Sequence, residues 1–315
     1  MQKQTLTIEK NTEADVSVRH RRHRRVAYVT FLAGSGDYWK GVVCLAKGLR
    51  AVKSSYPLVV AVLPDVPGAH RRALLDQGCL VREIQPVLPP DSQTKFAMPH
   101  YIINYSKLRI WEFVDYERLV FLDADIQVYA NIDHLFDLEA GQLYAVKDCF
   151  CEAAWGEQCQ EMAAWFPKPP PQYFNGGMLV LEPSLATAKA LLDRLALTTG
   201  FTPFAEQDFL NMFFKDVYKP IPWVYNLLVS MLWRHPEKVQ LGKAKVVHYC
   251  ALGSKPWRFT GEEPHMDRQD MKMLVNRWWD IYNDESLNYK HAADPLRVAL
   301  TEAGAVKHFS TPSAA

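Results

Sequence analysis

Residues 118–128 read RLVFLDADIQV, and this stretch decides the fold. Its uninterrupted apolar run, 119–122, is typical of a strand that is buried on both faces. Two carboxylates, Asp123 and Asp125, follow the run directly, with only Ala124 between them. Burying carboxylates at a strand end costs free energy unless another group compensates their charge. The rest of the sequence must therefore supply a charge partner for this pair.

The segments before this stretch alternate between strand and helix patterns. Buried-strand patterns occur at 25–34, 57–64 and 79–84, and helical patterns at 39–52, 67–78 and 105–116. Such alternation predicts a mostly parallel sheet with helices on both faces. Ligands of such sheets bind at the carboxyl ends of the strands. The loop after the first strand and the Asp pair should therefore open on the same edge.

The second half of the chain is less regular. A proline-rich connector at 167–172 precedes a predicted strand at 173–183 and a helix that begins after Ser184, its expected N-cap. The remaining predictions are helices at 206–214 and 271–283 and a short strand at 245–250. We expect one domain over 26–285, preceded by a disordered basic leader (1–25) and followed by a C-terminal segment and flexible tail (286–315).

Composition narrows the class of protein. Charges are balanced at a formal net charge of +1, which gives no general attraction to nucleic acid or to membranes. No N-terminal apolar signal region and no apolar run of about 20 residues is present, so we expect a cytoplasmic protein without a membrane segment. The six cysteines lack the paired spacing of a zinc site or a disulfide framework, which predicts free thiols.

The Asp pair and three basic residues are the candidates for chemistry. An Asp-x-Asp after a strand can bind one hard divalent cation through its oxygens. His248 ends another short apolar strand and is a candidate metal ligand, although a satisfied core histidine is the alternative. Lys255 follows a glycine in GSKPW, which suits a tight loop that brings an amine to a phosphate. Lys107 is a second candidate for that role, or else a solvated helix lysine.

Five segments occur in the order found in glycogenin-like glycosyltransferases of family 8, which the chain resembles over roughly residues 26–260. They are VTFLAGSGDYWKG (29–41), SKLRIWEFVDYERLVFLDADIQV (106–128), YFNGGMLVLEPS (173–184), EQDFLN (206–211) and HYCALGSKPW (248–257). The resemblance implies a GT-A fold, which is a single Rossmann-like α/β domain with a mostly parallel mixed sheet flanked by helices. It also implies a UDP-sugar donor, manganese and retention of anomeric configuration.

The segments FAMPHYIINYSKLRIWEFVDY (96–116), HYCALGSKPWRFTG (248–261) and the C-terminal PSAA (312–315) resemble, within this family, the galactinol-forming plant branch. That similarity implies transfer of galactose from UDP-galactose to myo-inositol, in the synthesis of raffinose-family oligosaccharides. For such a cyclitol acceptor, the candidate pocket residues are Asn175, Glu206, Gln207 and Trp257, whose alternative roles are loop geometry and core packing. Neither the acceptor nor the oligomeric state follows from the physics of the sequence.

The resemblance also implies roles for the matching positions. The implied manganese ligands are Asp123, Asp125 and His248. The implied donor-binding residues are Phe31, Ala33 and Tyr38 for the uridine, Lys107, Gly253 and Lys255 for the diphosphate, and Asp123, Ala124, Asn175 and Gly176 for the rest of the donor. The implied catalytic residues are Asp125, Lys255, Glu206 and Gln207. The chain departs from the family pattern at Glu206, where Asp is usual, in a longer His-to-Lys spacing than in glycogenin, and in an extra residue in AGSGDY.

On this interpretation, manganese compensates the carboxylate pair, and the UDP diphosphate compensates the metal. Because no nucleophilic carboxylate is placed by the sequence, we expect same-face attack by the acceptor hydroxyl rather than a covalent intermediate. Three alternatives stay open. A phosphatase would need Thr or Val where Gln127 stands and the Asp pair on the first strand. A nucleotide-sugar binding module without turnover, and a family-8 enzyme with another acceptor such as its own tyrosine, are the others.

Overall fold

The computed structural model describes residues 25–90, 96, 98–148, 172–199 and 202–290. Nearly all of the predicted leader and of the proline-rich connector, Cys149, Cys151 and Cys159, and the predicted tail beyond residue 290 lie outside these ranges. Among the described residues, Cys44 and Cys250 are free thiols, as predicted. Within the same ranges, no helix combines the length and the apolarity that crossing a membrane requires.

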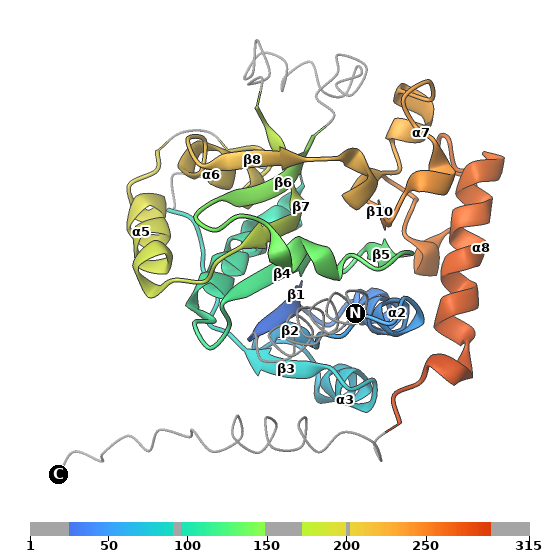
Figure 1. Ribbon diagram of the computed structural model, residues 1–315, viewed down its shortest axis with the longest axis horizontal. Coiled ribbons are helices and arrows are strands. Elements are labelled where there is room, and N and C mark those ends of the chain that lie inside the picture. Colours follow the sequence, from blue (N-terminus) through green and yellow to red (C-terminus); the bar gives the residue numbers. More distant parts are fainter. Residues whose placement is uncertain (1–24, 91–95, 97, 149–171, 200–201, 291–315) are drawn as a thin grey trace, which may run out of the picture.

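The described residues form a seven-stranded mixed sheet with the order β3-β2-β1-β4-β7-β6-β8 (Figure 1). Its strands are β1 Val26–Leu32, β2 Leu58–Val62, β3 Leu80–Glu83, β4 Arg118–Leu122, β6 Leu143–Lys147, β7 Phe174–Leu181 and β8 Tyr218–Ile221. β1 pairs in parallel with β2 and β4, whereas β7 runs antiparallel to both β4 and β6. The predicted mixed, mostly parallel sheet is therefore confirmed, and β6 and β8 are strands that the sequence patterns missed.

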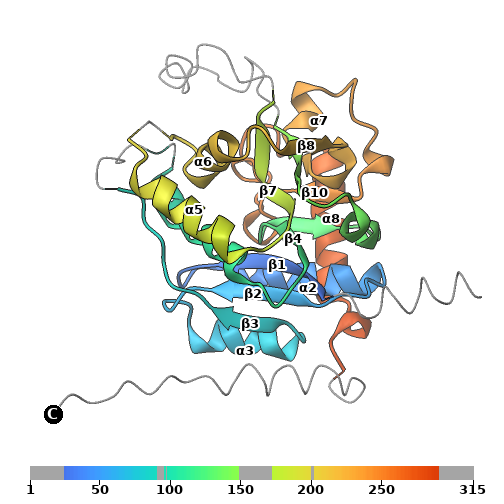
Figure 2. The same ribbon diagram turned by 60° about the vertical axis from the view of Figure 1, so that its left-hand side comes forward.

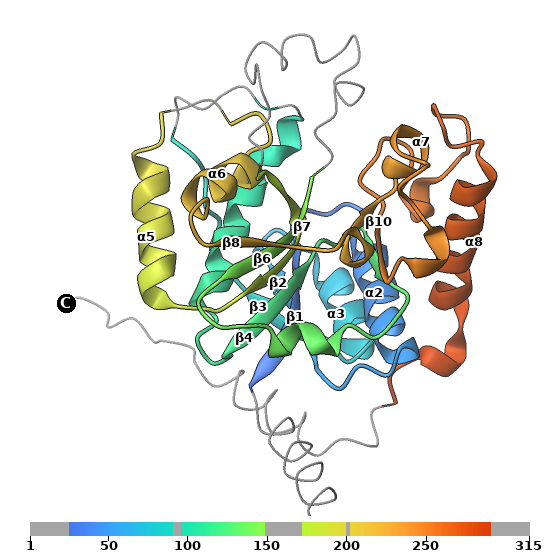
Figure 3. The same cartoon turned by 45° about the horizontal axis from the view of Figure 1, so that its top comes forward.

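Helices cover both faces of this sheet (Figure 3). α2 Trp39–Ala51, α3 Gly68–Asp76 and α8 Gln269–Asn283 lie on one side, and α5 Leu185–Ala196, α6 Glu206–Phe213 and the 3-10 helix η1 Pro99–Glu112 lie on the other. Alternation along β1 explains the two layers, because Ala27 and Val29 pack toward α5 while Val26 and Tyr28 pack toward α2. Ser184 caps α5 as predicted, since its hydroxyl accepts the Thr187 N–H.

A second, three-stranded sheet was not predicted as a separate unit. It consists of β5 Ile126–Val128, β10 Val246–His248 and β9 Leu227–Leu228, in the order β5-β10-β9. In Figure 1, β5 lies between β4 and α8, and Figure 2 shows β10 beside α8; α7 Met231–Arg234 follows β9 along the chain. Val247 and Tyr249 pack in one apolar cluster with Trp278 of α8. The small sheet thus joins the end of β4 to the C-terminal helix.

The chain after α8 folds back onto the domain. Its 3-10 helix η8, Glu285–Leu287, is held by Arg50 of α2, whose Nε donates to the Leu287 carbonyl at 2.5 Å. The Tyr289 ring covers Gly78, where an added Cβ would come within 2.6 Å of that ring. Gly78 also has a φ of +73°, so glycine is required there twice over. The packed body of the protein therefore extends to Tyr289.

Candidate active site

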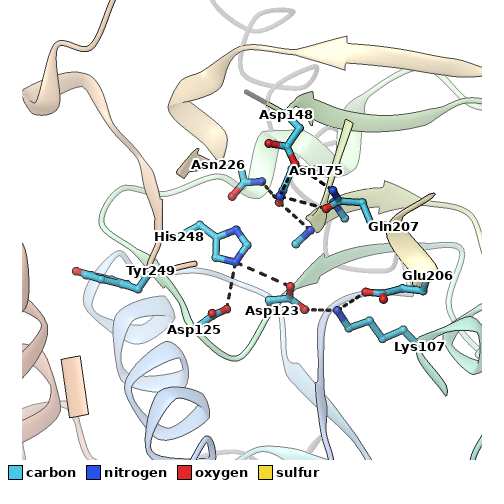
Figure 4. A network of polar contacts seen from close by, with 12 residues as sticks. Lys107, Asp123, Asp125, Asp148, Asn175, Glu206, Gln207, Asn226, His248 and Tyr249 are labelled. Atoms are coloured by element: carbon cyan, nitrogen blue, oxygen red, sulfur yellow. Dashed lines mark hydrogen bonds and ion pairs between the residues drawn. The ribbon is translucent and has the colours of Figure 1, made fainter. Parts of the chain in front are cut away.

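Two strand ladders bring the Asp pair and His248 together (Figure 4). β4 pairs antiparallel with β7, and beyond its end the Asp123 N–H donates to the Gly177 carbonyl at 2.8 Å. β10 pairs antiparallel with β5 so that His248 faces Ile126, next to Asp125. The Tyr249 N–H then donates to the Asp125 carbonyl at 3.0 Å. Residues more than 120 positions apart in sequence are therefore fixed to one point by backbone pairing.

The three side chains form a set that can hold a divalent cation. Their ligand atoms all lie within 4.8 Å of one another, and His248 Nε2 is 3.2 Å from Asp125 Oδ1 and 3.9 Å from Asp123 Oδ2. Adjacent ligands of an octahedral ion with bonds of about 2.1 Å lie about 3 Å apart, so a small closure would complete the site. Carboxylate oxygens and an imidazole nitrogen suit manganese or magnesium chemically. The donor set therefore fits the implied metal.

Each carboxylate of the pair uses its other oxygen to bind a lysine. Asp123 Oδ1 is 2.8 Å from Lys107 Nζ, and Asp125 Oδ2 is 2.6 Å from Lys255 Nζ. The lysine ammonium groups are the charge partners that the opening stretch of sequence required. Burial favours the neutral form of Asp125, but Lys255 and His248 outweigh it and hold the pKa of that carboxyl well below its usual range. Burial likewise opposes the charged form of Lys255, yet Asp125 keeps its pKa above the ordinary value.

Two sequence-based interpretations need correction here. Lys107 is not a solvated helix lysine, because its side chain is only 9% exposed and also binds Glu206 Oε1 at 2.8 Å. The expectation that metal alone compensates the Asp pair is wrong as well, since both carboxylates already have a lysine partner. Sequence could not reveal these contacts, because Lys255 lies 130 positions after Asp125 and no local pattern specifies where the side chain of Lys107, 16 positions before Asp123, points.

Glu206 lies at the first position of α6 and brings a third carboxylate to this cluster. Its Oε1 binds Lys107, whereas its Oε2 is buried and has no hydrogen-bond partner within the described part of the chain. Burial raises the pKa of Glu206, and Lys107 opposes that shift only in part. The preceding residue, Ala205, has a φ of +51°, a conformation that costs free energy outside glycine and clusters at functional sites. An unsatisfied buried oxygen calls for a donor, which a water or a ligand would supply.

Asn175 and Gly176, at the start of β7, lie against Gln207 of α6. Gln207 Oε1 accepts from the Gly176 N–H at 2.8 Å and from Asn175 Nδ2 at 3.2 Å. Asn175 Oδ1 in turn accepts from Asn226 Nδ2 at 2.9 Å. Asp148, which follows β6, accepts from both Asn175 and Gln207. No motif in the sequence singled out Asp148 or Asn226; both became visible only through these contacts.

The segment implied to bind uridine borders the GSKPW loop. Tyr38 packs edge-on against Trp257 at 5.4 Å between ring centroids, and Arg258 lies over the Tyr38 ring. Gly253 turns the loop with a φ of +74°. Trp257 is buried and also packs on Trp278, which fits the core-packing alternative. Phe31 is the penultimate residue of β1 and Ala33 directly follows that strand; the Phe31 ring is buried, and Ala33 is half-buried.

Gly177 offers a direct test of the His248 position. An added Cβ there would lie 2.3 Å from His248 Cε1 and 2.7 Å from Nδ1, so the imidazole would have to move. We expect Gly177→Ala to weaken manganese binding by about 10- to 100-fold, the range seen when a ligand loses its support. Isothermal titration with MnCl₂ measures this. Gly176→Ala is the matched control, because its Cβ would make ordinary contacts of 3.5 Å or more and should leave manganese affinity close to wild type. Equal affinity in both variants would contradict His248 as a ligand.

The chain matches a family model and several curated proteins over most of its length. The model of the family "Glycosyl transferase family 8" matches residues 29–261. Galactinol synthase 1 and Galactinol synthase 3 of Arabidopsis thaliana are 61% and 65% identical, over 92% and 85% of this chain and 91% and 84% of their own lengths. Galactinol synthase 2 of Solanum lycopersicum is 60% identical over 92% of this chain and 93% of its own.

Solved structures support the fold. An active-site mutant of LgtC superposes with a TM-score of 0.58 at 20% identity, covering 81% of this chain and 94% of its own. The galactosyltransferase LgtC in complex with donor and acceptor sugar analogs gives 0.53 at 19% identity, over 81% and 95% of the two chains. The GT-A type fold expected from the sequence is thereby confirmed. On the family match and the identity to its relatives, the chain belongs to glycosyl transferase family 8.

Proposed function

We propose that the chain is an inositol 3-alpha-galactosyltransferase, which transfers galactose from UDP-galactose to myo-inositol with retained configuration and gives galactinol and UDP. The observation that carries the proposal is the 60–65% identity to galactinol synthases over 85–92% of the chain. The convergence of Asp123, Asp125, His248, Lys107 and Lys255 supports turnover rather than binding alone, because charge of both signs is gathered where a diphosphate would leave.

The chemistry of the step is the departure of UDP from the anomeric carbon, which develops negative charge on a phosphate oxygen. Asp123, Asp125 and His248 would hold the divalent cation, which we propose is manganese and which supplies positive charge beside that oxygen. Lys255 donates from the GSKPW loop to the same diphosphate. Its ammonium lies beside Asp125, so it is already charged and oriented before the donor binds.

Glu206 is the group that we assign to a hydroxyl of the transferred sugar. Its buried Oε2 has no partner among the described residues, and a sugar hydroxyl would supply the missing donor. Lys107 fixes the other oxygen and so holds the carboxylate in place. With Glu206 assigned to hydroxyl binding, we retain same-face attack by the acceptor hydroxyl as the proposed route.

An acceptor assay tests the proposal. The protein is incubated with UDP-galactose and MnCl₂, with and without myo-inositol, and the products are identified by mass spectrometry and NMR. We expect an α-linked galactosyl-inositol and UDP release that depends on inositol. Parallel reactions with UDP-glucose measure donor choice. Absence of an inositol product, together with hexose bound covalently to a tyrosine of the chain, would overturn the proposal in favour of self-glycosylation.

A further inference from the structure

Gln207 has no polar capacity left over for a substrate. A carboxamide can accept two hydrogen bonds at oxygen and donate two from nitrogen. Its Oε1 accepts from Gly176 N and Asn175 Nδ2, and its Nε2 donates to Asp148 Oδ2 at 3.0 Å and to the Tyr173 hydroxyl at 3.1 Å. All four positions are therefore occupied by the protein itself. Its neighbour Glu206 differs, because there one oxygen lacks a partner within the described residues.

The orientation of this carboxamide is fixed from both ends. The Gly176 N–H can only donate, so it must face the oxygen of Gln207. At the other end, the Tyr173 hydroxyl donates to Asp208 Oδ1 at 2.6 Å and is left to accept from Gln207 Nε2. Asp208 Oδ2 is itself occupied by the Phe204 N–H at 2.7 Å. Both Asp208 oxygens thus act as acceptors, which requires the ionised carboxylate.

From these contacts we infer that Asp208 is a positioning residue, which fixes the Gln207 carboxamide through the Tyr173 hydroxyl. Gln207 in turn serves the reaction by holding Gly176 and Asp148 rather than by touching substrate. This replaces the catalytic role expected of Gln207 from the sequence. The inference rests on the proposed function only because the experiment that tests it measures hexose transfer. It concerns positioning and holds for any hexose that the site transfers.

The surroundings of Asp208 make this relay sensitive to pH. The side chain is almost fully buried, and the charged or titratable groups that act on it are Tyr173 before β7, Glu206 on its own helix and Asp148 after β6. Across the interface with η1, Tyr105 also interacts with Asp208 electrostatically. Burial raises the pKa of Asp208 to about 7, although the bonds from Tyr173 and Phe204 oppose the shift. Below that pH the carboxyl gains a proton and no longer accepts at both oxygens.

Two variants break the relay in different ways. Tyr173→Phe removes the hydroxyl and leaves one Gln207 N–H without its acceptor, at nearly constant volume. Asp208→Asn keeps the shape but offers an NH₂ group to one of two donors. We expect both to lower kcat for UDP-galactose and myo-inositol by about 10- to 100-fold, the effect of a small displacement in an active site. Tyr28→Phe is the matched control, because it removes another buried tyrosine hydroxyl that donates to an aspartate, Asp133 at 2.7 Å, on the opposite face of the sheet from α6. Its kcat should stay close to wild type at a similar loss of thermal stability.

The pH dependence separates positioning from a purely structural role. The kcat of the wild type should rise as pH increases through about 7, where Asp208 loses its proton. Tyr173→Phe should lack this rise, because it has no hydroxyl through which the protonation of Asp208 could affect Gln207. Stability should move in the opposite direction. The folded protein binds the Asp208 proton more tightly than the unfolded chain, so wild type loses stability from about pH 4 to about pH 7 relative to Asp208→Asn.

The outcomes are distinct. Equal kcat in wild type and Tyr173→Phe, or a pH limb that survives in Tyr173→Phe, overturns the inference. If Asp208→Asn fails to fold, Tyr173→Phe still decides the matter. A wild type that transfers nothing to inositol refutes the proposed function alone. In that case, release of UDP from the donor by hydrolysis or self-transfer provides the same comparison of variants.

Discussion

Asp125→Asn should lower turnover by about 1000-fold or more and should also destabilise the protein. One oxygen of Asp125 faces the His248 imidazole and the other binds Lys255, so a single change removes a metal ligand and the partner of a nearly buried lysine. Loss of the metal's charge at the leaving group is worth several kcal/mol, or about three orders of magnitude in rate. Breaking the ion pair costs about 3 kcal/mol, the lower end for buried pairs because both side chains keep some exposure. Steady-state kinetics and urea denaturation measure the two effects.

A double variant separates the two losses. Asp125→Asn combined with Lys255→Met removes both charges, so most of the stability should return while turnover stays low. The measurement belongs at neutral pH. The depressed pKa of Asp125 means that its contribution to stability is complete above the unfolded value of about 3.9 and is lost only as pH falls below it. Asp125→Asn with wild-type turnover, or full wild-type activity in excess chelator, would remove the Asp pair from the chemistry.

The parts of the fold that sequence predicts well are those set by local pattern. β1, β2 and β4 are mostly apolar strands of five to seven residues that are buried along their whole length, so their composition identifies them. β9 has only two residues, which is too short for a period to be seen, whereas the three residues of β10 lie within the strand predicted at 245–250. η1 was predicted as a helix over 105–116, but it is a 3-10 helix that begins six residues earlier, at Pro99. The backbone of Pro99 suits a first helical turn, a signal that the sequence did contain.

The candidate site likewise contains residues that the sequence predicts and residues that it does not. Asp123, Asp125 and His248 stand at strand ends, where the rule for ligand sites in α/β sheets applies directly. Asp148 and Asn226 lie in connecting segments, and Asp208 is the third residue of a helix that looked ordinary. Their positions depend on β7 running antiparallel between β4 and β6, a topology that no local pattern specifies. Pairings between distant residues were therefore out of reach from a single sequence.

Lys255→Met should lower kcat by about 100- to 1000-fold, which corresponds to the roughly 2.7–4 kcal/mol lost with one donor to a developing oxyanion. The ammonium acts on charge that grows as UDP leaves, so the KM for inositol should change far less than kcat. Lys47→Met is the matched control. Lys47 is another buried lysine, held by the carbonyl groups of Tyr282 and Asp284 away from the site, and its loss should cost stability without comparable loss of kcat.

Lys255→Met should also change manganese affinity, and in the opposite direction to kcat. Lys255 holds Asp125 Oδ2 at 2.6 Å, and its positive charge lies next to the place where a cation would bind. Removing the lysine charge leaves the negative charge of Asp125 uncompensated and takes away a positive charge that repels the cation. Lys255→Met should therefore bind manganese more tightly than wild type when no nucleotide is present. A variant that binds metal better and turns over worse cannot be explained by a damaged fold. If manganese affinity and kcat fell together, the effect of Lys255 would be structural, and the leaving group would have to be stabilised by other residues.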